Sequence, residues 1–114
     1  MASARLHLSA AALAAGLVAI GAPARAQDLP VIKVEMKDGT ITPNVIEVPA
    51  NTRFKLEITN TGTSPVEFES VELKREKALA AGATSSIVFR TVDPGTYDVF
   101  DDFHPNSKAT LVAK

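Results

Sequence analysis

The chain has 114 residues, of which 46% are hydrophobic and 22% charged, and its formal net charge is −1. This balance excludes the basic face that nucleic-acid binding requires. The absence of cysteine excludes disulfides, thiolate metal sites and thiol catalysis. A chain of this size has room for one small domain.

The first 26 residues have the pattern of a secretory signal peptide. Arg5 provides a positive start, residues 8–20 are apolar, and Ala24-Arg25-Ala26 provides the small residues of a cleavage site. A membrane anchor is the alternative, but this apolar stretch is short for a bilayer. We therefore expect removal of residues 1–26, export to the periplasm, and a mature domain of residues 27–114 with a net charge of −3.

The mature chain has the pattern of short strands separated by turn residues. Residues 53–60 alternate most clearly, with Phe54, Leu56 and Ile58 on one face. Further strands are expected at residues 31–36, 41–49, 66–69, 84–90, 96–100 and 108–113. The prolines of 41–49 suit an edge strand, and residues 70–80 form either one helical turn or an irregular crossover. Seven or eight such strands predict an all-β Greek-key sandwich.

The strand at 96–100 leads into Asp101-Asp102-Phe103-His104-Pro105, which places three potential metal ligands within four residues. Carboxylate oxygen and imidazole nitrogen suit iron, manganese or zinc. If His104 is a ligand, its other ring nitrogen needs an acceptor, for which Asp102 or a backbone carbonyl is a candidate. The alternative is a loop network in which Asp101 orients the imidazole and both groups cap turn amides.

Three further acidic residues are weaker candidates for a metal site. Asp38 precedes Gly39, and this pair is first a hairpin-turn signal. Glu67 and Glu69 lie two residues apart, so a strand places both on one face, which is also the pattern of a solvated face. No serine is recognisable as a partner of His104 and no Gly-rich phosphate loop is present, so hydrolase and kinase functions have no support.

Several segments resemble a cupredoxin: residues 46–52 with the strand that ends at Asn60, the loop 60–65, and the strand 94–100. At the ligands the sequence departs from the blue-copper pattern. Val66 stands at the first histidine position, Asp101 stands at the cysteine position, and no sulfur lies near the axial methionine position. A trigonal site of two histidines and a cysteine therefore cannot form, which excludes blue-copper electron transfer.

A narrower resemblance rests on Glu67-Phe68-Glu69-Ser70, on Glu76-Lys77 and on Asp101-Asp102-Phe103-His104-Pro105. These motifs resemble the periplasmic cupredoxin-like proteins and domains of bacterial ferrous-iron uptake, the EfeO-type and FtrB-like group. The resemblance implies iron, in some members copper, as the metal. It implies a periplasmic iron-binding partner and a membrane iron permease. It also implies Asp101 and His104 as catalytic and metal-ligating residues, with Asp38, Glu67 and Glu69 as further ligands.

We therefore expect a periplasmic protein that binds Fe(II) and promotes its oxidation, with ferroxidase-like chemistry, before uptake by the permease. One alternative is a module that binds or delivers copper without catalysis. Another is a metal-free interaction domain. One imidazole and a few carboxylates leave coordination positions open, so a homodimer or a partner is a candidate to complete the site.

Overall fold

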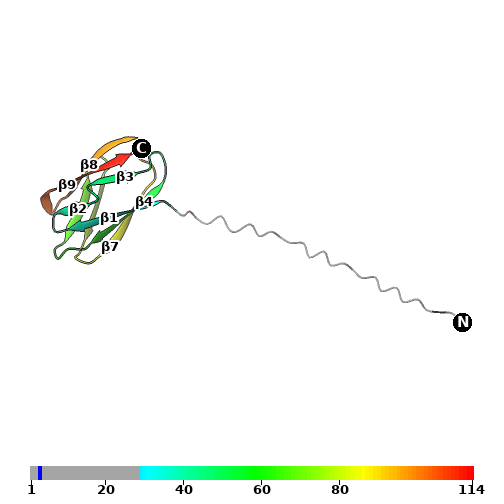
Figure 1. Ribbon diagram of the computed structural model, residues 1–114, viewed down its shortest axis with the longest axis horizontal. Helices are drawn as coiled ribbons and strands as arrows, with labels where there is room; N and C mark the ends of the chain where they lie inside the picture. Colours follow the sequence, from blue (N-terminus) through cyan, green and yellow to red (C-terminus); the bar gives the residue numbers. More distant parts are fainter. Residues whose placement is uncertain (1–2, 4–28) are drawn as a thin grey trace.

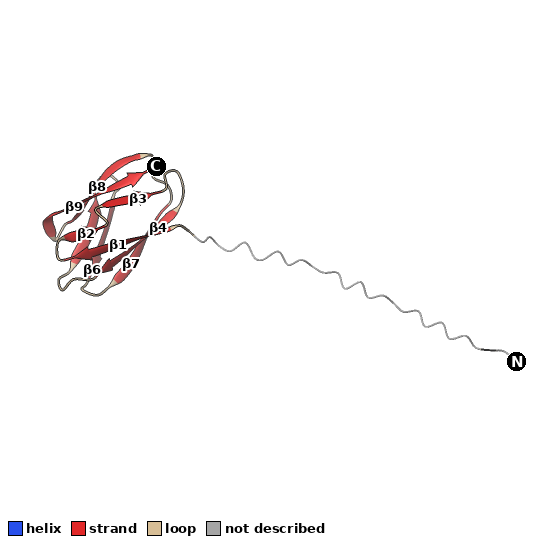
Figure 2. Ribbon diagram, in the orientation of Figure 1, coloured by secondary structure: helices blue, strands red, loops and turns tan. Residues whose placement is uncertain are grey.

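The computed structural model describes residue 3 and residues 29–114 of the chain. The predicted signal peptide, with its alternative of a membrane anchor, falls on residues 1–26, which lie outside the described residues except for Ser3. Every regular element in the described part is a β-strand (Figure 2). None of these residues forms a helix of the length and apolarity needed to cross a membrane.

The strands of the described part are short, and turns or loops separate most of them. Their bounds are β1 (Val31–Lys37), β2 (Thr40–Thr42), β3 (Val45–Val48), β4 (Phe54–Asn60), β5 (Val66–Ser70), β6 (Arg75–Leu79), β7 (Thr84–Phe89), β8 (Gly95–Asp101) and β9 (His104–Ala113). The predicted strands other than the one at 41–49 are therefore confirmed, and the last one begins earlier than expected, at His104.

The strands form two sheets that pack against each other (Figure 1). The first has the order β2-β1-β4-β7 and the second the order β3-β9-β8-β5-β6. The pairs β1–β4 and β3–β9 are parallel, and the other pairs are antiparallel. The chain crosses repeatedly between the sheets. This arrangement confirms the predicted all-β sandwich, with nine strands in the described residues instead of seven or eight.

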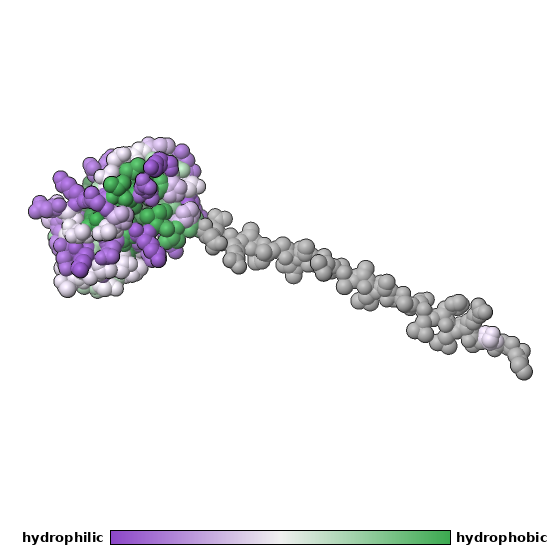
Figure 3. Space-filling model, in the orientation of Figure 1, coloured by the Kyte–Doolittle hydropathy of each residue, from purple (hydrophilic) through white to green (hydrophobic). Residues whose placement is uncertain are grey.

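The core lies between the inner faces of the two sheets. In β4, buried residues alternate with partly exposed ones, and Phe54, Leu56 and Ile58 are fully buried as predicted. The rings of Phe54 and Phe89 stack with their centroids 4.9 Å apart. Burying each side chain of this size stabilises the fold by about 1.5–3 kcal/mol. Hydrophilic side chains cover much of the face seen in Figure 3, around a hydrophobic area.

The prediction of a single strand at residues 41–49 is wrong, because the structure has two strands there, β2 and β3. β2 lies at the edge of the first sheet and β3 at the edge of the second. Pro43 lies between them, where the chain changes sheets. The expectation of edge strands is confirmed, since a proline that lacks an N–H is tolerated at a sheet edge or strand end.

Residues 70–80 form neither a helical turn nor an irregular crossover. A turn at residues 71–74 leads into the edge strand β6, which pairs with β5 from Val66↔Leu79 to Ser70↔Arg75. The first four residues of β6 are exposed and only Leu79 is buried. A strand with so little buried surface has no alternation of apolar and polar residues, which is why the pattern did not reveal it.

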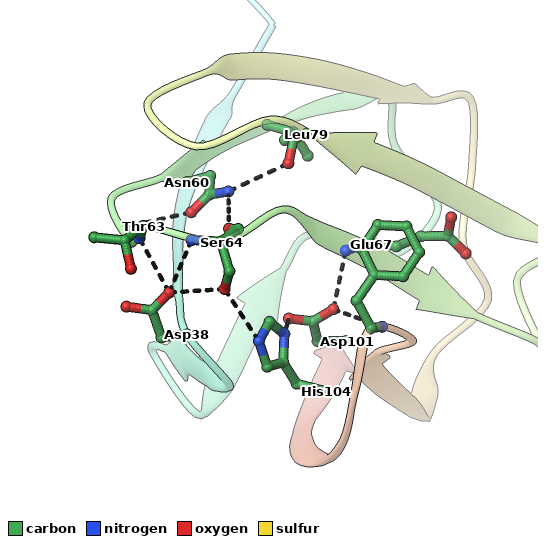
Figure 4. Close-up of polar contacts among 10 residues, drawn as sticks. Asp38, Asn60, Thr63, Ser64, Glu67, Leu79, Asp101 and His104 are labelled. Atoms are coloured by element: carbon green, nitrogen blue, oxygen red, sulfur yellow. Dashed lines mark hydrogen bonds and ion pairs between the residues drawn. The ribbon is translucent and has the colours of Figure 1, made fainter.

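Three connections meet at one end of the sandwich. They are the β1–β2 turn, the β4–β5 loop and the β8–β9 turn (Figure 4). Because β1 and β4 are parallel neighbours, both strands deliver the chain to this end. The polar residues carried by these connections form the first part of the candidate site.

Candidate functional site

Asp101 closes β8 and is buried, with an exposed fraction of 1%. Its Oδ1 accepts hydrogen bonds from the backbone N–H of Glu67 at 2.9 Å and of Phe103 at 3.0 Å. Its Oδ2 lies 2.7 Å from Nδ1 of His104, the first residue of β9. Three donors therefore compensate the burial of this carboxylate.

Contacts at both ring nitrogens of His104 fix the orientation of its imidazole. Nδ1 contacts Asp101, and Nε2 lies 3.2 Å from Oγ of Ser64 (Figure 4). The expectation that no serine partners this histidine is wrong, because Ser64 is distant in sequence and reaches the ring only through the fold. The acceptor at Nδ1 is Asp101, not Asp102, whose backbone N–H instead donates to the carbonyl of Glu67 at 2.9 Å.

Asp38 lies in the β1–β2 turn, where its φ is 42° and that of Gly39 is 94°. This confirms the hairpin-turn role. Its Oδ1 accepts from the Ser64 hydroxyl at 2.9 Å and from the backbone N–H groups of Thr63 and Ser64 at 3.0 and 3.1 Å. The bond from the Ser64 hydroxyl, followed by that from Thr63, lowers the pKa of Asp38. A Cβ on Gly62 would lie 2.6 Å from Oδ1, so the turn and the loop are closely packed.

The contacts above form one chain of hydrogen bonds, which we call the loop-end network: Asp38, Ser64, His104 and Asp101. The Ser64 hydroxyl donates to Asp38, so its remaining capacity toward the ring is as an acceptor. A ring that carries both protons then donates to Ser64 and to Asp101. In that state every contact of the network joins a donor to an acceptor.

Asn60 supports the same loop and was missed by the sequence analysis. It is fully buried at the end of β4. Its Nδ2 donates to the carbonyls of Ser64 at 2.9 Å and Leu79 at 3.2 Å, and its Oδ1 accepts from the N–H of Gly62 at 3.0 Å. Asn at the start of a turn followed by Gly was the available signal, because such side chains bond to nearby backbone.

Glu67 and Glu69 lie on the outer face of β5, as their spacing predicts, and β6 adds Glu76 directly opposite Glu69. One carboxylate oxygen from each of the three residues lies within 4.8 Å of those of the other two. We call Glu67, Glu69 and Glu76 the glutamate cluster. Glu76 was missed as a site residue, because only the β5–β6 register reveals its place.

The electrostatics of the glutamate cluster are unfavourable without a cation. Partial burial raises the pKa of Glu67, and the neighbouring charges of Glu76, Asp102, Glu69 and Asp101 raise it further. Burial also raises the pKa of Glu69, with Asp102 and Glu76 adding to the effect. Like charges on facing positions of adjacent strands destabilise a sheet. A bound cation would remove this repulsion.

The structure divides the five predicted site residues into two groups. Asp38, Asp101 and His104 belong to the loop-end network, whereas Glu67 and Glu69 belong to the glutamate cluster. Figure 4 shows the carboxylate of Glu67 pointing away from the imidazole. The two groups are nevertheless joined, because the backbone N–H of Glu67 donates to Asp101.

The two groups differ in how well they fit a metal ion. Two ligands on a tetrahedral ion with bonds of about 2.1 Å lie about 3.4 Å apart. Oδ2 of Asp101 and Nδ1 of His104 are 2.7 Å apart, so an ion does not fit between them while they are hydrogen-bonded. The oxygens of the glutamate cluster lie within 4.8 Å of one another, and a cation that entered there would not have to displace a hydrogen bond between its ligands.

The comparison with protein-family models decides the family. A model described as "Cupredoxin-like domain" matches residues 9–113. The chain belongs to this family. The cupredoxin-like protein is also 37% identical over 76 residues to "Uncharacterized protein RP394" of Rickettsia prowazekii (strain Madrid E). The match covers 67% of this chain and 61% of that relative, so the cupredoxin-like protein spans about three fifths of the relative's length.

Solved cupredoxins have the same fold as this cupredoxin-like protein. Auracyanin B superposes with a TM-score of 0.63 at 20% identity, over 77% of this chain and 92% of that one. A purple cupredoxin from Nitrosopumilus maritimus gives 0.56 at 18% identity, over 73% and 99%. Amicyanin from Paracoccus versutus gives 0.57 at 13% identity, over 76% and 82%. At these identities the likeness establishes the fold alone.

Proposed function

We propose that this cupredoxin-like protein is an exported iron-binding protein that holds Fe(II) at the glutamate cluster and promotes its oxidation before uptake. The observation that carries the proposal is the convergence of Glu67, Glu69 and Glu76, whose oxygens lie within 4.8 Å of one another on two paired strands. The negative charges of these three carboxylates repel one another, which lowers the stability of the metal-free protein. A bound cation would neutralise this repulsion and restore the stability.

The donor atoms favour iron over soft metals. Carboxylate oxygens are hard ligands, whereas thiolate and thioether would favour Cu(I). Anionic oxygens bind Fe(III) more strongly than Fe(II), so an all-carboxylate site lowers the potential of the bound iron and helps Fe(II) to lose one electron. Dioxygen, a copper ion or a partner protein is the acceptor of that electron. The ferric ion would then pass to the next component.

The cellular setting follows from the predicted signal peptide and from the resemblance to ferrous-iron uptake proteins. The cupredoxin-like protein would act in the periplasm beside a periplasmic iron-binding partner and a membrane iron permease. The cluster lies on the edge strand β6 and its neighbour β5, with Glu76 exposed and the other two partly exposed. A homodimer or the iron-binding partner is therefore a candidate to complete the coordination.

Copper binding without catalysis is the second candidate function. Nitrogen and oxygen sites bind Cu(II) more tightly than Fe(II), following the general order of divalent-metal affinities. The fold is also that of auracyanin and amicyanin. Copper at the glutamate cluster would lack the thiolate of a blue site, because the chain has no cysteine.

Titration of the mature protein with Fe(II), first without oxygen and then in air, tests the proposal. We expect binding and oxidation above the buffer rate in the wild type and loss of both in Glu69→Gln. Glu57→Gln on β4 of the other sheet removes a carboxylate outside the cluster and should match wild type. Asp101→Ala and His104→Ala, assayed in parallel, report whether the loop-end network contributes.

Calorimetry with Cu(II) separates the candidate functions. Tight Cu(II) binding with negligible affinity for Fe(II) would replace the iron proposal with copper carriage. No binding of either metal, with a melting temperature that metals leave unchanged, would favour a metal-free interaction domain, because a ligand that binds only the native state stabilises it.

A further inference from the structure

The main chain of Glu67 is held on both sides by the β8–β9 turn. Its N–H donates to Oδ1 of Asp101 at 2.9 Å, and its carbonyl accepts from the N–H of Asp102 at 2.9 Å. The strands β5 and β8 pair at only two positions, Phe68↔Asp101 and Glu69↔Phe100. The backbone N–H of Glu67 is therefore bonded to the side chain of Asp101 and not to a backbone carbonyl of β8.

Asp101 is itself held in place by His104. With Oδ1 bonded to two backbone amides and Oδ2 bonded to Nδ1, the buried carboxylate has no free oxygen. The imidazole is held in turn by Ser64 at Nε2. Removing the imidazole leaves Oδ2 without its donor and lets the carboxylate rotate away from Glu67.

We propose that Asp101 and His104 are positioning residues for the glutamate cluster and do not bind the cation themselves. This inference rests on the proposed function at that cluster. The three carboxylates repel one another, so their own interactions do not hold them together. The backbone bond from Glu67 to Asp101 fixes the end of β5 from which the Glu67 side chain reaches the cluster.

The two ring nitrogens of His104 should differ in their effect on the cation affinity of the glutamate cluster. Nδ1 acts on Asp101 and through it on Glu67, whereas Nε2 acts on Ser64. Asparagine at position 104 can place its amide N–H near the position of Nδ1, and glutamine can place its own near Nε2. The affinity of the cluster should therefore survive His104→Asn better than His104→Gln.

The experiment measures Mn(II) affinity, a redox-silent probe for a hard divalent site, in His104→Ala, His104→Asn and His104→Gln. Groups that orient metal sites indirectly affect affinity by about 10 to 100-fold. We expect a loss of about 10-fold in His104→Ala and His104→Gln and of less than about 3-fold in His104→Asn. Ile46→Val, on β3 at the opposite edge of the same sheet, controls for a general loss of stability and should retain wild-type affinity.

Electron paramagnetic resonance of the Cu(II)-loaded protein distinguishes positioning from direct ligation. We expect a spectrum without imidazole nitrogen coupling, unchanged in His104→Asn. Nitrogen coupling in the wild type that disappears in both His104→Asn and His104→Gln would make His104 a ligand and overturn the inference.

Mn(II) binding by Glu69→Gln and His104→Ala distinguishes failure of the positioning role from failure of the proposed function. If Glu69→Gln abolishes Mn(II) binding while His104→Ala binds like wild type, the inference fails and the cluster stands. If wild type does not bind Mn(II), or Glu69→Gln binds it normally, both fail. Circular dichroism of each variant at the titration temperature establishes that the folded protein is being compared.

Discussion

The loop-end network and the glutamate cluster both contain acidic residues and meet at the start of β5, but the environments of their carboxylates are opposite. In the network, Asp101 and Asp38 each accept three hydrogen bonds. In the cluster, Glu67, Glu69 and Glu76 face one another with neighbouring charges of the same sign. Both oxygens of Asp101 are bonded to donors of this chain, whereas no ion pair to the cluster is present among the described residues.

This difference indicates which acidic residues are available to hold a cation. A carboxylate whose oxygens are all bonded to protein donors stabilises the fold, and a metal ion would have to displace those donors first. Neighbouring negative charges that raise the pKa of a carboxyl group destabilise its ionised form, and a bound cation would remove that destabilisation.

Asp101→Ala should lower the free energy of unfolding by about 3–5 kcal/mol, measured by urea denaturation. The substitution leaves the N–H groups of Glu67 and Phe103 and Nδ1 of His104 without their acceptor in a buried place. Asp102→Ala is the matched control next to it, and its exposed side chain predicts a change within about 0.5 kcal/mol. Equal effects of the two substitutions would contradict the network's structural role.

Mn(II) at about 100 times its dissociation constant should raise the free energy of unfolding of the wild type by about 2.7 kcal/mol. Glu69→Gln should lose most of this gain, because it removes one oxygen ligand and one charge from the cluster. Urea denaturation with Mn(II) or with EDTA measures the difference. A gain of the same size in Glu69→Gln would place the cation elsewhere.

Gly62→Ala should destabilise the protein by about 1–3 kcal/mol, as overpacking does. The added Cβ would lie 2.6 Å from Oδ1 and 2.9 Å from the backbone nitrogen of Asp38, and a backbone atom cannot easily move away. Thr63→Ala in the same loop keeps the backbone N–H that bonds to Asp38 and should change stability by less than about 0.5 kcal/mol. Thermal unfolding of both variants measures the contrast.

The two regions should also differ in the sign of their pH dependence in the metal-free protein. The pKa of Asp38 is lowered from 3.8, so its contribution to stability is present above pH 3.8 and is lost as pH falls through the lowered pKa. The pKa values of Glu67 and Glu69 are raised from 4.5. Their contribution is present below pH 4.5 and is lost as pH rises through the raised values.

Urea midpoints in EDTA between about pH 2.5 and 7 resolve these opposite slopes. Asp38→Asn should flatten the acidic limb, where wild-type stability rises with pH. The double variant Glu67→Gln and Glu69→Gln should remove the decline just above pH 4.5, because glutamine does not titrate. If the double variant keeps that decline, the repulsion in the cluster is weaker than the structure indicates.

Local patterns in the sequence were enough to predict the all-β class, the core positions of β4, the edge position of the proline-containing segment and the hairpin turn at Asp38. These features depend on local alternation and turn chemistry, which a single segment carries. Asp101 and His104 were recognised for the same reason, because they lie three residues apart in one turn.

Which polar groups come into contact depends on the tertiary fold. Ser64 reaches His104 across 40 positions of the sequence, and Glu76 joins Glu69 through the register of an edge strand that has no apolar alternation. Strand pairing sets such contacts between segments, and no single segment contains the information about its partner or register. For that reason the sequence named five candidate residues without showing which of them share a site, and the fold separated them into the loop-end network and the glutamate cluster.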